Sequence, residues 1–250
     1  MHELLRVENI SRRFGGLLAL DRASLIAEEG QIVALVGPNG AGKTTLFSII
    51  TGFLDPSEGR VLYRDDDITR QPPHLLARRG IARTFQIAQP FAGLTVRENI
   101  AVGAHLHHAR RARALAAAEA IAQEVGLAPM LDQSAANLTV AGRKRLELAR
   151  ALAIEPKLLL LDEVLAGLNP SEVRDMVPVI KAIRARGITI VMIEHVMQAV
   201  MSLAEQVFVI AEGRIIAMGP PDAIAADARV IEAYLGHGAA ERMRGMAANG

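Results

Sequence analysis

The sequence has 250 residues, a length that can bury a substantial core and that favours one large domain or one domain carrying an inserted subdomain. Hydrophobic residues make up 51% of it and the formal net charge is +1, which excludes a disordered chain and a strongly basic, polyanion-binding protein. It has no cysteine, which excludes disulfides, zinc-thiolate sites and cysteine nucleophiles and permits a reducing compartment.

The sequence predicts neither a signal peptide nor a membrane-spanning helix. Its first six residues lack the basic and then apolar layout of a signal peptide. The most apolar stretch, residues 188–210, is interrupted by Glu194, His195, Gln198 and Glu205. It therefore falls short of the roughly 18 to 20 uninterrupted apolar residues that a membrane span needs. We expect any membrane role to be exercised through a partner.

The amino-terminal part of the chain predicts an antiparallel edge sheet, then a buried strand and a helix. Residues 4–10 and 24–27 alternate weakly, as expected of the edge sheet, and residues 59–63 are a candidate for a further strand of it. Residues 31–36 form the continuous apolar run of a buried strand, and residues 42–52 have the pattern of a helix.

The middle of the chain has a different composition. Residues 95–153 are rich in alanine, leucine and arginine and carry almost no strand signal. We therefore expect a helical subdomain inserted into an α/β body.

The carboxyl-terminal half returns to strands that alternate with helices, which is typical of a mostly parallel sheet covered by helices. A helix is predicted at residues 171–186, ended by Gly187, and a hairpin at residues 211–218 with its turn at Glu212-Gly213. The predicted buried strands are residues 157–162, 188–193 and 206–210. We expect one domain over residues 1–235 and a loose tail over residues 236–250.

A glycine-rich loop joins the first buried strand to the helix after it. Its pattern, glycine, four residues and then Gly-Lys-Thr, stands in the strand-to-helix context that a phosphate-binding loop requires. The predicted nucleotide-binding residues here are Gly37, Pro38, Asn39, Gly40, Ala41, Gly42, Lys43, Thr44 and Thr45. Glycines let backbone N–H groups converge on phosphates, Lys43 can reach the outer phosphates, and the Thr44 hydroxyl can help to hold Mg²⁺. The alternative is an ordinary glycine turn, which does not account for the agreement at both ends.

Two carboxylates follow the four leucines of residues 158–161. Asp162 lies at the carboxyl end of a predicted strand, where the site of an open α/β sheet lies, and it is a candidate for holding the metal through water. Glu163 extends beyond it as a candidate general base. An Asp-Glu pair after leucines is by itself usually a helix cap or a solvated turn. The phosphate loop earlier in the chain favours the functional interpretation.

Along nearly its whole length the sequence resembles the ATP-binding-cassette (ABC) ATPases. The motifs that carry the resemblance stand in the family's order, and they include the phosphate loop, Arg83-Thr84-Phe85-Gln86, Asp162-Glu163 and Ile193-Glu194-His195. The resemblance implies an α/β P-loop NTPase core with a mostly parallel sheet, an antiparallel β edge subdomain and an inserted helical subdomain. It also implies ATP and Mg²⁺ as ligands.

The resemblance assigns roles to three further residues. Gln86 would reach the metal and the attacking water on a loop that couples the site to a transmembrane partner, and His195 would contact the terminal phosphate. Phe14 would stack on adenine. Taken singly, Gln86 could be a surface loop residue, His195 a core or capping residue, and Phe14 a core residue of an edge strand. Motif order favours the functional roles of Gln86 and His195, while both interpretations of Phe14 stay open.

The chain departs from the family in the signature segment, which usually reads Leu-Ser-Gly-Gly-Gln. Counted without gaps, residues 138–142 read Leu-Thr-Val-Ala-Gly. Thr139 keeps a hydroxyl, whereas Ala141 replaces a glycine expected to approach the other subunit's nucleotide. A slip of one residue would instead put Gly142 at that contact. In the family's dimer-contact loop, Asn169 stands where many members have aspartate.

Four strings narrow the resemblance to the ATP-binding subunits of high-affinity branched-chain amino-acid importers, a group with relatives assigned to amides and urea. These strings are residues 13–20, 83–86, 166–170 and 193–197. The resemblance implies a peripheral ATPase on the cytoplasmic face of the cell membrane. It would be bound to two permease subunits and to a second ATPase subunit, which is either identical or paralogous. An extracytoplasmic solute-binding protein would act indirectly, and no nucleic acid is expected.

Two other functions compete with this one. The altered signature could leave a nucleotide-dependent regulatory or assembly module with weak hydrolysis. A soluble member of the superfamily acting in DNA repair or translation is disfavoured. Such chains generally carry paired cassettes or added nucleic-acid-binding domains, whereas this sequence shows a single cassette and a net charge near zero.

Overall fold

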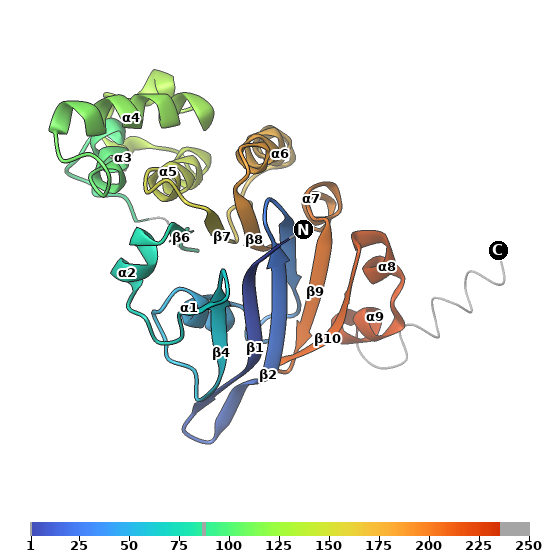
Figure 1. The fold of residues 1–250 in the computed structure, drawn as a ribbon. Helices are drawn as coiled ribbons and strands as arrows, with labels where there is room; N and C mark the ends of the chain where they lie inside the picture. Colours follow the sequence, from blue (N-terminus) through green and yellow to red (C-terminus); the bar gives the residue numbers. More distant parts are fainter. Residues whose placement is uncertain (1, 87–88, 236–250) are drawn as a thin grey trace, which may run out of the picture.

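A central sheet of six strands organises the protein, with the strand order β10-β9-β3-β8-β7-β6 (Figure 1). The computed structural model describes residues 2–86 and 89–235, so the tail predicted at residues 236–250 lies outside it. The strands are β3 (Ile32–Val36), β6 (Ile81–Arg83), β7 (Leu158–Asp162), β8 (Thr189–Ile193), β9 (Gln206–Ala211) and β10 (Arg214–Gly219). All neighbours pair in parallel except β9 and β10, which form the predicted hairpin.

The inner strands are apolar except at two strand ends, Asp162 and Thr189, because both faces of the sheet are covered. Every residue of β3, β7 and β8 is buried. Along β3, Ala34 packs into one core cluster and its neighbour Leu35 into another on the opposite face. This alternation explains why the sequence shows continuous apolar runs rather than a period of two.

A second, antiparallel sheet covers one of these cores, with the order β2-β1-β4-β5. Its strands are β1 (Glu3–Phe14), β2 (Leu17–Glu28), β4 (Glu58–Tyr63) and β5 (Asp66–Asp67). The first two are longer than predicted because irregular pairing interrupts their alternation. Register shifts fall between Val7 and Ile10, and Asn9 between them has φ 49°. Such bulges turn side chains out of phase, so a period-two pattern reveals only part of each strand.

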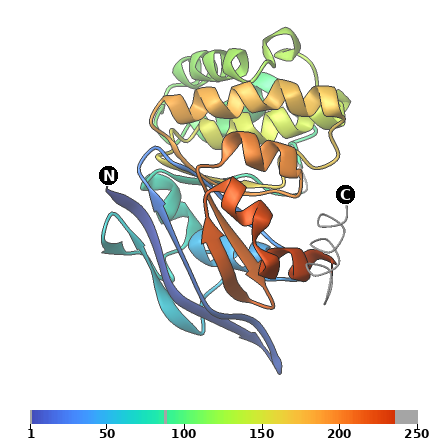
Figure 2. The same cartoon turned by 90° about the vertical axis from the view of Figure 1, so that its right-hand side faces the viewer.

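Helices cover the other face, which lies uppermost in Figure 2. Helices α3 (Val96–Ala104), α4 (Arg111–Glu124) and α5 (Val140–Leu152) fall where the composition predicted helices without strands. On the same face lie α6 (Pro170–Ala185), α7 (Met197–Leu203), α8 (Pro221–Ala226) and α9 (Ala228–Leu235), with 3₁₀ turns at Ala128–Met130 and Ala135–Asn137. Helices α1 (Lys43–Ile50) and α2 (Pro73–Arg78) pack instead into the core under the antiparallel sheet. Within residues 2–86 and 89–235, no helix is long and apolar enough to span a membrane.

Local sequence accounts for where the longest helix begins and ends. Helix α6 starts with a capping box, in which Asn169 Oδ1 accepts the Glu172 N–H at 3.0 Å and Glu172 Oε2 accepts the Asn169 N–H at 2.9 Å. Pro170 occupies the first position of the helix, where no N–H is needed. Gly187 has φ 83° and ends the helix, as its sequence position predicted.

Gly103 generates a prediction about the packing of α3 against α5. A Cβ at this position would lie 2.8 Å from the Arg150 carbonyl oxygen and 2.9 Å from the Ala153 Cβ. In an exposed helix, Gly→Ala gains up to about 1 kcal/mol, but overpacking at a close contact costs about 1–3 kcal/mol. We expect Gly103→Ala to lower the free energy of unfolding measured by urea titration. Val102→Ala, at an exposed neighbouring position, is the control, and a stabilised Gly103→Ala protein would contradict the close contact.

Candidate functional site

The predicted site residues follow the carboxyl ends of four neighbouring parallel strands. The phosphate loop follows β3, His195 follows β8, Glu163 follows β7 and Gln86 follows β6. These strands are consecutive in the sheet order, so segments far apart in sequence meet at one edge. The short strand β6 was not predicted, yet it is the element that brings Gln86 to this edge.

The phosphate loop has a conformation that requires glycine at its end. Gly42 has φ 106°, and a Cβ there would lie 2.7 Å from the Ala19 carbonyl oxygen and 2.8 Å from Leu20 Cδ2. No side chain caps the α1 amino terminus, and its first turn contains no acidic residue. The N–H groups of this turn can therefore receive an anion. The Gly213 N–H donates to the Ala41 carbonyl at 3.0 Å, which ties the predicted hairpin turn to the loop.

Lys43 lies inside the turn of this loop. Its ammonium donates to the carbonyl oxygens of Gly37, at 2.7 Å, and Pro38, at 2.9 Å, and the residue is buried. Burial lowers the pKa of Lys43, and the negative charges of Glu163 and Asp162 oppose that shift. Among the described residues, the ammonium of Lys43 is hydrogen-bonded to carbonyl groups of its own loop and not to a carboxylate.

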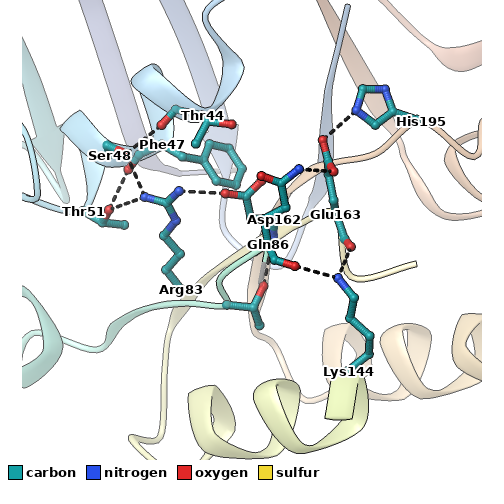
Figure 3. A network of polar contacts seen from close by, with 11 residues as sticks. Thr44, Phe47, Ser48, Thr51, Arg83, Gln86, Lys144, Asp162, Glu163 and His195 are labelled. Atoms are coloured by element: carbon teal, nitrogen blue, oxygen red, sulfur yellow. Dashed lines mark hydrogen bonds and ion pairs between the residues drawn. The ribbon is translucent and has the colours of Figure 1, made fainter. Parts of the chain in front are cut away.

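Three of the predicted catalytic residues, Gln86, Glu163 and His195, meet at the Glu163 carboxylate (Figure 3). Its Oε2 accepts the Gln86 side-chain amide at 2.7 Å, and its Oε1 lies 2.7 Å from His195 Nε2. Burial raises the pKa of Glu163, but the hydrogen bonds from His195 and Gln86 outweigh it and leave the pKa below its ordinary value. The carboxylate is therefore ionised at neutral pH. It is held from both sides at the end of β7.

One cavity of about 690 Å³ joins the loop to these residues. It is lined by Phe14, Leu17, Ala19, Asn39, Gly40, Ala41, Gly42, Lys43, Thr44, Thr45, Gln86, Glu163 and His195. Phe14 is 45% exposed, so the alternative of an edge-strand core residue is wrong. Its ring lies 4.7 Å from the Arg12 guanidinium carbon, and it belongs to the wall of the cavity. Gly37 and Pro38 lie behind the lining, and a Cβ at Gly37 would meet the Ile210 carbonyl oxygen at 2.0 Å.

Asp162 forms a buried ion pair with Arg83. The Arg83 guanidinium donates to Asp162 Oδ2 at 2.7 Å and to Ser48 Oγ of helix α1 at 3.0 Å (Figure 3). The other carboxylate oxygen, Oδ1, is buried and has no hydrogen-bond partner among the described residues. Asp162, Thr44 and Gln86 line a second cavity, of about 570 Å³. Oxygen donors of this kind suit Mg²⁺, which is bound through one or two carboxylates and the phosphates of its substrate, so the residues present fit that ion.

The signature segment lies away from both cavities. Thr139 is the N-cap of α5, and its Oγ1 accepts the Gly142 N–H at 3.2 Å. A Cβ on Gly142 would lie 3.2 Å from Leu138 Cδ2, so this glycine faces the interior, while Val140 is 56% exposed. Ala141 is half-buried. The fold of one chain does not bring Thr139, Ala141 or Gly142 to the residues around Glu163.

Three residues in contact with the site were not singled out from the sequence. Arg83 was identified only as part of the motif at residues 83–86, with no role of its own, and no role was predicted for Lys144. The Lys144 ammonium donates to the main-chain carbonyls of Gln86, at 3.0 Å, and Glu163, at 2.8 Å. Glu194 is fully buried and accepts the Leu165 N–H at 2.9 Å, and burial raises its pKa to about 7. The sequence signal that could have identified Lys144 was a basic residue on the buried face of a helix. For Glu194 it was an acidic residue inside an apolar run.

Comparison with known proteins supports one family. The sequence model of the ABC transporter family matches residues 20–166, and that of the branched-chain amino acid ATP-binding cassette transporter family matches residues 214–240. The high-affinity branched-chain amino acid transport ATP-binding protein BraF of Pseudomonas aeruginosa is 38% identical, over 93% of this chain and 98% of its own. Its counterpart LivG of Escherichia coli is 39% identical over the same shares.

A solved structure agrees with these relatives. The crystal structure of the ADP conformation of MJ1267, an ATP-binding cassette of an ABC transporter, has a TM-score of 0.85 and 34% identity, over 95% of this chain and 100% of that one. The resemblance inferred from the motifs is thereby confirmed. The chain belongs to the ABC transporter family, as one of its nucleotide-binding ATPases.

Proposed function

We propose that this chain hydrolyses MgATP at sites shared between two cassettes and thereby drives an importer of branched-chain amino acids or a related small polar solute. The observation that carries the proposal is the meeting of Lys43, Gln86, Glu163 and His195 around one cavity. We treat residues 1–235 as one cassette with a helical subdomain at residues 95–153, and residues 236–250 as its tail.

The proposed chemistry is positioning and electrostatic stabilisation, as is usual for phosphoryl transfer. The amide groups of the loop and Lys43 bind the phosphates, and His195 donates to the terminal phosphate. Glu163, ionised and held by two hydrogen bonds, orients the attacking water and accepts its proton. Thr44, Asp162 and Gln86 would hold Mg²⁺, which neutralises charge on the phosphates when it is bound. Phe14 stacks on the base from the wall of the cavity.

A second cassette, identical or paralogous, completes each site in this proposal. Its signature helix would present Thr139, Val140 and Ala141 to the nucleotide, in keeping with their place at the start of α5. Asn169, next to the amino terminus of α6, would lie in the dimer contact. Hydrolysis would open this interface.

Membrane partners would bind beside Gln86. The cavity of about 570 Å³ there is lined by Phe85 and Phe91, each 45% exposed, and by Arg150 of α5. Exposed aromatic side chains around a hollow are typical of protein interfaces. We propose two permeases at this place, one for each cassette. The chain would then be peripheral on the cytoplasmic face of the membrane, and an extracytoplasmic binding protein would deliver the solute.

The solute is inferred from the relatives. BraF and LivG are named as branched-chain amino acid transport proteins, and the match at residues 214–240 is to a family of the same description. Radiolabelled leucine uptake by proteoliposomes that hold the assembled transporter tests this assignment. Competition by unlabelled valine and isoleucine is expected, and uptake of urea or an amide alone would contradict it.

Glu163→Gln tests the catalytic role of that carboxylate. The amide keeps the shape and hydrogen-bonding reach of the side chain but cannot accept the proton of water. We expect steady ATP hydrolysis to fall by at least about 100-fold, with ATP affinity unchanged within about threefold. Phosphate release and nucleotide binding measured on the assembled complex decide the matter. Turnover equal to that of the unaltered chain would remove Glu163 from the role.

Ala141→Gly tests whether the altered signature weakens hydrolysis. Helix α5 begins directly after Thr139, so we expect the rate of the assembled complex to change by less than about threefold. Glycine should also destabilise the helix by about 0.5–1 kcal/mol, seen as a lower melting temperature. A strong rise in ATPase rate would instead favour a module in which the native signature limits hydrolysis.

A further inference from the structure

Lys144 is a buried cation in helix α5. Its residue exposure is 8%, and its ammonium donates to two main-chain carbonyls from different segments, Gln86 and Glu163 (Figure 3). A buried charge is costly unless hydrogen bonds satisfy it. These two bonds are charge-assisted and therefore stronger than bonds between neutral groups.

The contacts of Lys144 close a ring. Its ammonium bonds the Gln86 carbonyl, the Gln86 side chain donates to the Glu163 carboxylate at 2.7 Å, and the Glu163 carbonyl returns to the same ammonium at 2.8 Å. The ring joins α5, the loop after β6 and the end of β7. Each segment is hydrogen-bonded to both of the others, so a movement of one segment changes its bonds to the other two.

Hydrogen bonds on both sides of Glu163 hold it in an unusual backbone conformation. Its φ is 51°, in the left-handed region that residues other than glycine rarely adopt. On one side its N–H donates to the Ile193 carbonyl at 3.0 Å, and on the other its carbonyl accepts from Lys144. The proposed general base is therefore fixed by strand β8 on one side and by α5 on the other.

We propose that Lys144 is a positioning residue that links the signature helix to the Glu163 of its own chain. Lys144 stands five residues after the N-cap Thr139 in one continuous helix. When the amino terminus of α5 contacts the nucleotide of the partner cassette, the helix shifts. The Lys144 ammonium transmits this shift to Gln86 and Glu163. Binding at one composite site thus sets the geometry at the other. This inference rests on the proposed function.

The test compares Lys144→Met, Lys144→Arg and a matched control, Lys181→Met, in the full-length protein. Methionine keeps the length of the side chain and removes its donors, whereas the arginine fork can again reach two acceptors. For Lys144→Met we expect kcat to fall roughly tenfold or more, ATP affinity to stay within about threefold, and the cooperativity of hydrolysis in ATP to weaken. Lys144→Arg should recover most of the rate. Lys181, exposed on α6, should be silent.

A double-mutant cycle separates positioning from general structural support. If Lys144 acts through the ring, the effects of Lys144→Met and Gln86→Ala on kcat will be less than additive. Additive effects, an unchanged kcat, or equal losses of kcat and ATP affinity that Lys144→Arg does not repair would overturn the inference. Should Lys144→Met fail to fold, Lys144→Leu, which also lacks a donor, takes its place with the same expectations.

Glu163→Gln, measured beside these variants, distinguishes a failure of the Lys144 role from a failure of the proposed function. Normal turnover in Lys144→Met with abolished turnover in Glu163→Gln would refute the role of Lys144 and leave the proposed function intact. Normal turnover in Glu163→Gln would refute both.

Discussion

The arrangement of the site depends on the buried ion pair between Arg83 and Asp162. The two side chains are 7% and 1% exposed, and the guanidinium also bonds Ser48 of α1 and faces the rings of Phe47 and Phe85. Breaking such a pair from one side costs about 3–5 kcal/mol, because the remaining charge stays buried. The pair therefore fixes three elements at once: β6, which leads to Gln86, β7, which leads to Glu163, and α1, which begins at the phosphate loop.

This ion pair uses only half of the Asp162 carboxylate. Oδ2 is satisfied by Arg83, and the main-chain N–H of Asp162 is satisfied by Thr84 Oγ1 at 3.0 Å, while Oδ1 has no partner in the described part of the chain. A buried acceptor without a partner is unfavourable unless something else supplies the interaction. Arg83 orients the carboxylate and keeps one oxygen for a further ligand.

The parts of the site that the sequence predicted are those coded by neighbouring residues. The phosphate loop and the Asp162-Glu163 pair each follow an apolar strand directly, so pattern alone placed them at the sheet edge. Gln86 follows a strand of only three residues, β6, which is too short for a pattern, and its role came from family resemblance. Asp162 lies 79 residues from Arg83, and Gln86 lies 58 residues from Lys144. These contacts can therefore be inferred only once the order of the strands in the sheet is known. The bulges of β1 and β2 hid strand lengths for a different reason, since they break the alternation that reveals a strand.

The altered signature segment can be interpreted in the same physical terms. Thr139 Oγ1 accepts the Gly142 N–H, which leaves the hydroxyl proton of Thr139 to be donated elsewhere. The first N–H groups of α5 lack intrahelical acceptors, and no acidic residue stands in that turn to repel an anion. The donors that a signature helix would offer to phosphate are therefore retained. In the proposed dimer, the methyl group of Ala141 and the exposed side chain of Val140 would change how closely the partner cassette can approach. Lys144 lies on the same helix and contacts Glu163. The distance between the signature segment and the partner's nucleotide would therefore affect both proposed sites of a dimer.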